Sequence, residues 1–161
     1  MSTARPEGQS RPVCTFIVDG LLFGVDVVQV QEVLRYQEMT PVPLACSVVS
    51  GLINLRGQIV TALDMRERLG LPPRPADALP TNLIIRDQQR VVSLLVDEIG
   101  DVVEVDADSF EPAPDTLSAA SRALIDGVYK FSPQLLLLLN TERAVRVEPF
   151  AATKRNDHVE Q

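Results

Sequence analysis

The chain has 161 residues, a formal net charge of −7 and a sequence pI near 4.7. This length suits one domain, or two small lobes that share a core. The acidic balance argues against a nucleic-acid-binding protein, because contacts to phosphates need a surplus of Lys and Arg. The single histidine, His158, is the fourth residue from the C-terminal end of the sequence, which nearly removes every mechanism that depends on a positioned imidazole.

The cysteines and the apolar runs bear on the cellular compartment. Cys14 and Cys46 match no metal or redox spacing and form no disulfide framework, so a reducing cytoplasm is expected. Residues 1–12 are polar and lack the apolar core of a signal peptide. The leucine run Leu135–Leu139 is too short to span a bilayer. We therefore expect a cytoplasmic protein without membrane insertion.

The first predicted element is a β-hairpin. Residues 1–12 are expected to form a disordered arm, with structure beginning at Val13. The apolar runs Cys14–Val18 and Leu21–Val25 flank the dipeptide Asp19–Gly20. Asp-Gly between two apolar runs predicts a tight hairpin turn, because both central residues of such a turn need positive φ.

The next segments mix strand and helix signals. The apolar spacing of Val27–Leu34 fits a short helix or a twisted strand, and both interpretations stay open. Gly57 lies between two strand-like runs, which indicates a tight turn or a bulge. Asp64 is a suitable N-cap for a short helix over Met65–Leu69, which Gly70 would end.

The second half repeats the pattern of short strands. A proline-rich loop indicates a junction between two sub-cores near residues 72–81. The strands expected beyond it are Asn82–Arg86, Arg90–Val96, Val102–Val105, Leu124–Phe131 and Gln134–Leu139. The stretch Glu111–Ala119 is expected to be a loop, Asn140 to cap a last short helix, and residues 148–161 to form a flexible tail.

These elements predict an all-β fold with few short helices. Short strands at roughly ten-residue spacing are typical of small barrels or a sandwich. Parallel βαβ units are not expected, since no segment of helical length is available to cross over between parallel strands.

The sequence lacks the common catalytic and cofactor motifs. It contains no phosphate-binding loop, dinucleotide fingerprint, zinc-protease motif or serine elbow. The segment Asp106–Ser109 begins like a calcium loop, but Glu111 stands where the loop needs glycine. No catalytic, metal-binding or cofactor-binding residue is therefore predicted. A small carboxylate enzyme remains an alternative, and it would need a perturbed acid such as Asp64 or Asp97 in a pocket.

One segment carries most of the negative charge. It contains eight acids and no Lys or Arg: Asp97, Glu98, Asp101, Glu104, Asp106, Asp108, Glu111 and Asp115. Without them the 22 acids of the chain fall to 14, against 15 Lys and Arg. The segment either protects a strand edge from unwanted pairing or selects a partner by charge complementarity.

The run around Arg56 places a cation in a very apolar context. Strand alternation puts Ile53, Leu55 and Gly57 on one face, and Leu52, Asn54 and Arg56 on the other. Arg56 then has two possible roles. It ties a turn together through its N–H groups, or it anchors a partner, since Arg is frequent among interface hot spots.

Several motifs in the same order resemble CheW-like domains. They are Phe16–Asp26, Val30–Val33, Val49–Leu69, Arg90–Asp97, Gly100–Val103 and Leu136–Asn140. The likeness covers about residues 13–147. Thr61 is a departure, because the family usually has proline at that position in the strand.

The resemblance implies a fold of two intertwined five-stranded barrels related to SH3 barrels. It leaves open whether the first hairpin crosses over to complete the other lobe. It also implies a non-enzymatic adaptor that couples chemoreceptor cytoplasmic hairpin tips to the regulatory domain of the histidine kinase CheA. Such an adaptor works in the cytoplasm at membrane-associated receptor arrays, without a cofactor. Scaffolding of another chemosensory system, such as type IV pilus motility, is the alternative.

The resemblance also implies roles for individual residues. Positions that match the family's receptor groove are Val30, Glu32, Val33 and Val102, and those that match its coupling turn are Asn54, Arg56 and Gly57. The kinase contact is expected at the barrel ends. If the protein instead scaffolds something other than a receptor array, a charged residue at Val30 or Val102 should leave partner binding intact.

Overall fold

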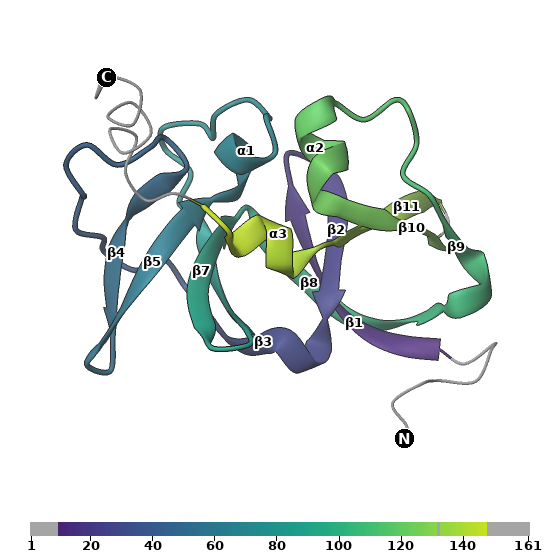
Figure 1. Ribbon diagram of the computed structural model, residues 1–161, viewed down its shortest axis with the longest axis horizontal. Helices are drawn as coiled ribbons and strands as arrows, with labels where there is room; N and C mark the ends of the chain where they lie inside the picture. Colours follow the sequence, from purple (N-terminus) through teal and green to yellow (C-terminus); the bar gives the residue numbers. More distant parts are fainter. Residues whose placement is uncertain (1–9, 132, 148–161) are drawn as a thin grey trace, which may run out of the picture.

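The computed structural model describes residues 10–131 and 133–147 (Figure 1). Its strands are β1 (Ser10–Val18), β2 (Leu21–Asp26), β3 (Val30–Leu34), β4 (Val49–Leu55), β5 (Gln58–Asp64), β6 (Thr81–Asp87), β7 (Arg90–Val96), β8 (Glu98–Asp106), β9 (Phe110–Glu111), β10 (Ile125–Phe131) and β11 (Gln134–Leu139). Its helices are the 3₁₀ turns η1 (Val27–Gln29) and η2 (Ala107–Ser109), and α1 (Met65–Arg68), α2 (Ala119–Leu124) and α3 (Thr141–Val145).

The six-stranded sheet forms a barrel of five chain segments. Its strand order is β8-β1-β2-β11-β10-β9. The strands at the two ends of this order, β8 and β9, are one stretch of chain bent at η2. Because β8 pairs with β1 and β9 pairs with β10, this bent stretch closes the sheet on itself.

The five-stranded sheet closes in a similar way. Its strand order is β3-β6-β7-β5-β4. The chain continues beyond β3 and pairs again at Thr40, whose N–H and C=O both bond Leu52 of β4 at 2.8 Å. The expected all-β fold with two five-stranded barrels is therefore confirmed, with a bent segment closing each barrel.

The two barrels exchange chain segments. The first hairpin, β1 and β2, belongs to the same sheet as β8–β11, so the chain passes between barrels at η1 and again at Asp97. The expected junction near residues 72–81 is wrong: that segment connects β5 and α1 to β6, and β5 and β6 lie in one sheet. Proline content signalled a loop there but not a boundary between sub-cores.

The start of the first strand differs slightly from expectation. Strand β1 begins at Ser10 rather than at Val13, because residues 10–12 pair with Glu104–Asp106 of β8. The rest of the predicted arm, residues 1–9, and the predicted tail, residues 148–161, lie outside the described residues.

Two strand pairs are parallel, β11 with β2 and β5 with β7, although neither is joined by the βαβ unit that the sequence prediction excluded. Parallel strands are usually connected through a helix. Here the connection from β5 to β7 runs through α1, the proline-rich segment and the whole of β6. The crossover is thus built from a strand and loops rather than from a helix.

Three apolar clusters explain the long apolar runs. The first contains residues of both sheets and lies between the barrels, with Phe16, Phe23, Leu63, Met65, Leu69, Leu83, Leu94 and Leu137 among its members. The second belongs to the six-stranded sheet: Val13, Leu22, Val105, Tyr129, Leu136 and Leu138. The third belongs to the five-stranded sheet: Ile53, Leu55, Val60 and Ile84. Strands such as β11 are apolar on both faces because one face fills a barrel and the other packs between barrels.

The predicted turns and caps are largely confirmed. The hairpin turn at Asp19 and Gly20 has φ values of 52° and 76°. Asp64 caps α1, accepting from the Arg66 N–H at 3.0 Å, and Asn140 caps α3. Both interpretations of Val27–Leu34 hold in part, since η1 leads directly into β3.

Helix α2 was not predicted. The sequence assigned its first residue to a loop and its last to a strand. Ser118 caps this helix by accepting from the Ser121 N–H at 3.1 Å, ahead of two alanines. A serine N-cap before strong helix formers was the signal that could have revealed it.

Candidate docking surface

Strand β3 carries three of the predicted site residues on the outer edge of one barrel. Val30, Glu32 and Val33 pair with Ile85, Ile84 and Leu83 of β6, and β3 ends the strand order of its sheet. Val33 is 43% exposed, although it is a valine. Exposed apolar residues next to a charged one on an edge strand favour an interaction surface.

Val102 lies on the corresponding edge of the other barrel. It pairs with Cys14 of β1, and its side chain is 56% exposed. Strand β6, the neighbour of β3, packs against β8, so one strand separates the two edges. That the two edges border one receptor groove stays a prediction.

The turn between β4 and β5 is built by Asn54, Arg56 and Gly57. Arg56 and Gly57 have φ values of 52° and 87°, and the Asn54 side-chain oxygen accepts from the Gly57 N–H at 2.9 Å. The alternation predicted for this run is confirmed, since Ile53 and Leu55 are buried whereas Asn54 is exposed. Asn54 and Gly57, rather than Arg56, therefore hold the turn together.

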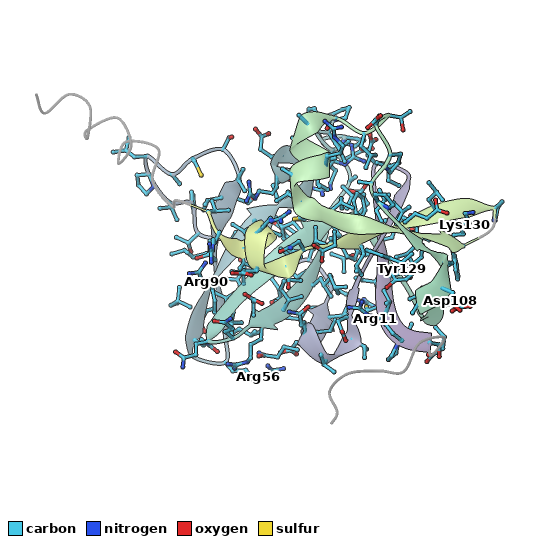
Figure 2. All side chains as sticks on the ribbon, turned by 45° about the vertical axis from the view of Figure 1, so that its right-hand side comes forward. Arg11, Arg56, Arg90, Asp108, Tyr129 and Lys130 are labelled. Carbon is cyan, nitrogen blue, oxygen red and sulfur yellow. The ribbon has the colours of Figure 1, made fainter. Side chains whose placement is uncertain are left out.

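Arg56 instead reaches across to β3. Its Nη2 donates to Glu32 Oε1 at 2.8 Å and its Nη1 to Glu32 Oε2, so the pair is bidentate. The sequence placed Arg56 and Glu32 in two separate groups, and nothing local connects residues 24 positions apart. The structure brings them together at one end of the molecule, where Arg56 marks the tip of the hairpin (Figure 2).

The Arg56–Glu32 pair faces solvent. The Arg56 side chain is 70% exposed and that of Glu32 22%. The hydrogen bond from Arg56 lowers the pKa of the Glu32 carboxyl below its usual value, so Glu32 stays ionised. An exposed, preformed ion pair contributes little to stability but presents a fixed charge pattern to a partner.

The acids considered for a carboxylate enzyme have structural partners. Burial alone would raise the pKa of Asp97, but hydrogen bonds from Arg66, the Asp19 amide and Arg74 lower it below the usual value. Asp64 is engaged as the cap of α1. Two arginines that neutralise Asp97 leave it unsuited to act as a general acid.

The acidic segment lies mainly along β8. Glu98, Asp101, Glu104 and Asp106 of this strand are exposed and flank Val102 in sequence. Farther along the chain, Glu111 pairs with Lys130 at 3.1 Å. Both interpretations, protection of a free edge and selection of a partner by charge, fit this placement.

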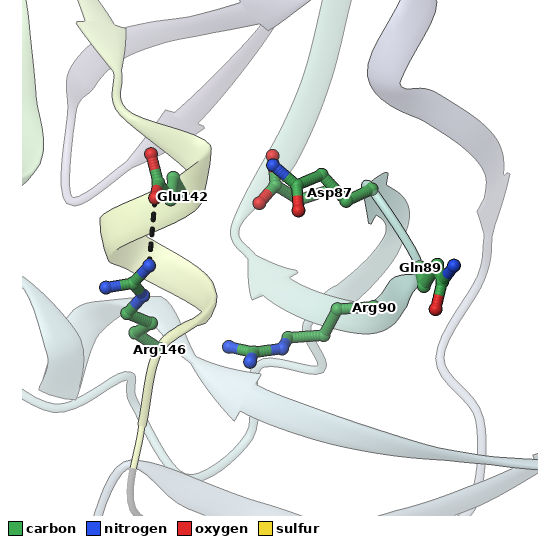
Figure 3. Close-up of a pocket in the computed structure, with 6 residues that line it drawn as sticks. Asp87, Gln89, Arg90, Glu142 and Arg146 are labelled. Atoms are coloured by element: carbon green, nitrogen blue, oxygen red, sulfur yellow. Dashed lines mark hydrogen bonds and ion pairs between the residues drawn. The ribbon is translucent and has the colours of Figure 1, made fainter.

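A polar pocket of about 410 Å³ lies elsewhere, between the β6–β7 turn and α3 (Figure 3). Its lining is Asp87, Gln88, Gln89, Arg90, Glu142 and Arg146. Glu142 is paired with Arg146 at 2.9 Å, and Asp87 accepts from the Gln29 side chain at 3.3 Å. Its two acids are thus occupied, and none of the predicted site residues lines it.

Within residues 10–131 and 133–147, no group of three or more His, Cys, Asp or Glu side chains could hold a metal ion. None of the helices in this described part is long and apolar enough to cross a membrane.

Two fused barrels with exposed valines on their edge strands form the architecture of a protein-docking scaffold. The CheW-like domain family matches residues 12–148, and the chain belongs to this family of non-enzymatic scaffolding proteins. A crystal structure of the scaffolding protein TtCheW from Thermoanaerobacter tengcongensis superposes with a TM-score of 0.72 at 26% identity, covering 81% of this chain and 88% of that one.

Curated relatives agree with this assignment. The chemotaxis protein CheW of Rhizobium meliloti is 30% identical over 82% of this chain and 85% of its own length. The chemotaxis protein CheW of Klebsiella aerogenes is 27% identical, covering 80% and 78%. Protein PilI of Pseudomonas aeruginosa is also 27% identical, covering 75% and 72%.

Proposed function

We propose that this scaffold couples the cytoplasmic hairpin tips of chemoreceptors to the regulatory domain of the histidine kinase CheA. In this role it works in the cytoplasm at membrane-associated receptor arrays. Val30, Glu32, Val33 and Val102 receive the receptor helices between the two edge strands. The relatives named chemotaxis protein CheW support this assignment.

The observation that carries the proposal is the placement of exposed valines beside a fixed ion pair. Val33 and Val102 are apolar and exposed on the free edges of two barrels. Glu32, beside Val33, is held in place by Arg56 from the neighbouring turn. An amphipathic helix buries apolar side chains on such a surface and meets charges at its rim.

The kinase regulatory domain is expected to bind at the barrel ends, away from the edge strands. Receptor and kinase then bind at the same time, as coupling requires. Pseudo-symmetric packing of two domains with the same fold would extend this contact into rings. No individual residue is assigned to the kinase contact.

A second system remains a candidate because of one relative. The identity to PilI, 27%, lies within the 22–30% range found for relatives named chemotaxis protein CheW, although the match covers less of this chain. The scaffold therefore serves either flagellar chemotaxis or a pilus-type chemosensory system. Identifying the receptor and the kinase that bind this protein in its own cell distinguishes the two systems.

Kinase activity provides the direct test. Receptor-containing membranes and the kinase of the same cell are combined with and without this protein, and kinase autophosphorylation is measured. We expect a large rise that requires the protein and is lost in Arg56→Ala while the variant stays folded. If neither partner binds the protein, the adaptor role is wrong.

The receptor surface is tested with Val102→Glu and a matched control, Leu79→Glu. Both side chains are exposed, Val102 by 56% and Leu79 by 66%, so neither change should unfold the protein. Val102→Glu should abolish binding to a receptor-tip fragment but not to the kinase domain, whereas Leu79→Glu should bind both normally. Intact receptor binding by Val102→Glu would show that the receptor contacts a different surface of the protein.

A further inference from the structure

Helix α1 lies beside the boundary between the two barrels (Figure 1). It follows β5 of the five-stranded sheet, and Met65 and Leu69 anchor it in the apolar cluster that both sheets share. Arg66 and Arg68 project from this short segment. Arg66 contacts the residue at which the chain crosses between the sheets, and Arg68 contacts α3.

Arg66 binds Asp97, the residue at which the chain crosses from one sheet to the other. Arg66 Nε lies 3.1 Å from Asp97 Oδ1 and its Nη2 lies 2.7 Å from Oδ2. Arg74 adds a bond from Nε to Oδ1 at 3.2 Å. From the other barrel, the Asp19 N–H donates to Asp97 Oδ2 at 2.8 Å, and the Asp97 N–H donates to the Ile17 carbonyl at 2.9 Å. One carboxylate is thus held from both barrels.

This cluster is largely shielded from water. The side chains of Arg66 and Arg74 are each 11% exposed, and that of Asp97 is 17% exposed. Screening by salt and water is therefore weak, and the planar guanidinium of Arg66 fixes both distance and angle. The apolar core between the barrels lacks this directionality, because hydrophobic burial depends on area rather than on orientation.

Arg68 forms a second connection on α1. Its Nη2 donates to the Arg143 carbonyl at 2.7 Å and its Nε to the Ala144 carbonyl at 3.3 Å, near the C-terminal end of α3. In addition, the buried Ser121 hydroxyl of α2 donates to the Leu69 carbonyl at 3.0 Å. Helix α2 leads directly into β10 of the six-stranded sheet, whereas α3 follows β11 but also contacts β6 of the five-stranded sheet. Polar contacts therefore join α1 and the residue after it to Asp97 and to α2, and Arg68 adds a bond to a helix that contacts both α2 and β6.

We propose that α1, through Arg66, fixes the orientation of the two barrels and so the separation of β3 from β8. Arg66 is then a positioning residue for the docking surface. The functional part of this inference rests on the proposed receptor role of Val33 and Val102. The geometric part stands on the contacts of α1 alone.

Distances between the two edges test the geometric part. Spin labels are placed at Val33→Cys and Val102→Cys in a background in which Cys14 and Cys46 are replaced, and pulsed dipolar spectroscopy gives the distance distribution. We expect one narrow distribution for the parent. A distribution that is already broad in the parent would overturn a fixed orientation.

The same distance is then measured in Arg66→Lys and Asp97→Asn, with Arg122→Lys as the control. Arg122 follows Ser121 on α2, but its side chain forms an exposed pair with Asp115 at 3.6 Å and takes no part in the contacts of α1 described above. We expect a broader or displaced distribution for the first two variants and the parent distribution for the control. Arg66→Lys keeps the charge, and its folding is verified by circular dichroism. Folded Arg66→Lys with the parent distribution would overturn the proposal.

Binding assays on the unlabelled proteins separate this inference from the proposed function. Arg66→Lys should weaken binding of a receptor-tip fragment, which contacts both barrels, several-fold more than binding of the kinase domain. If the parent fails to bind receptor tips while the distances respond to Arg66→Lys, the receptor role is wrong and the positioning role stands. If the parent binds them and the distances do not respond, the positioning role is wrong.

Discussion

Two of the arginine–carboxylate sites in the molecule differ sharply in their access to water. In one, Arg56 holds Glu32 at the exposed tip of a hairpin. In the other, Arg66 and Arg74 hold Asp97 at the boundary between barrels, where little water reaches the charges. Water and salt weaken the first pair, whereas the second keeps most of its electrostatic attraction. The comparison indicates that the shielded site determines structure and the exposed site remains available for recognition.

The largest effect on stability is expected from Asp97→Ala. The substitution leaves the positive charges of Arg66 and Arg74 poorly compensated in a largely buried place. Removal of one partner from a buried ion pair costs about 3 kcal/mol or more, so denaturant unfolding should show a loss of about 3 kcal/mol. Asp115→Ala, in an exposed pair, should show no measurable loss. Equal losses of unfolding free energy in Asp97→Ala and Asp115→Ala would contradict the distinction between shielded and exposed sites.

Lowering the pH should weaken the shielded site at Asp97. The folded pKa of Asp97 lies below its unfolded value of about 3.9, so its contribution is full above that pH and is lost as the pH falls through the folded pKa. The charged groups that face it are Arg66 and Arg74, which stay cationic, and Asp19 and Asp64.

The measurement compares the free energy of unfolding of the parent and Asp97→Asn between about pH 6 and about pH 3. The difference in free energy of unfolding between the two proteins should narrow below about pH 4. Protonation of Asp97 in the parent then removes the negative charge that the Asp97→Asn variant already lacks. Glu32 has a lowered pKa in both proteins and cancels in the comparison. If the plots of unfolding free energy against pH for the two proteins stay parallel over the whole range, a lowered pKa for Asp97 is contradicted.

A smaller effect is expected at the hairpin that carries the exposed site. Gly57 has a φ of 87°, and the space that a Cβ would take there is open, with no atom within 4 Å, so only backbone strain opposes a side chain. Gly57→Ala should therefore cost about 1 kcal/mol of unfolding free energy. Gly57→Asn should cost less, because Asn adopts positive φ more readily. Equal losses for Ala and Asn would indicate a cause other than backbone strain.

Local signals in the sequence predicted the turns and caps well. The Asp19–Gly20 turn and the caps Asp64 and Asn140 follow from the chemistry of neighbouring residues. Each depends on a few consecutive positions, where side-chain type and backbone conformation are directly linked. The resemblance, by contrast, was needed to expect two barrels.

Features that depend on long-range contacts could not be read from the sequence. The pairing of Arg56 with Glu32 joins two strands that are neither consecutive nor adjacent in their sheet order. The prolines near residues 72–81 indicated a break in secondary structure, but the boundary between barrels is set by strand pairing on either side of Asp97. Asp97 was counted among the acids of a charged segment, whereas its two arginine partners remove it from that surface.

The smallest effect on stability, with a clear effect on binding, is expected at the exposed pair. Glu32→Gln and Arg56→Gln should leave the denaturation midpoint unchanged, because solvent already screens the two charges. Each should weaken binding of a receptor-tip fragment by about tenfold, since a partner meets an altered charge pattern beside Val33. If the pair acts as one unit, the double variant should bind no more weakly than either single variant. Additive losses would mean that Glu32 and Arg56 contact the partner independently, and the ion pair would then be incidental to recognition.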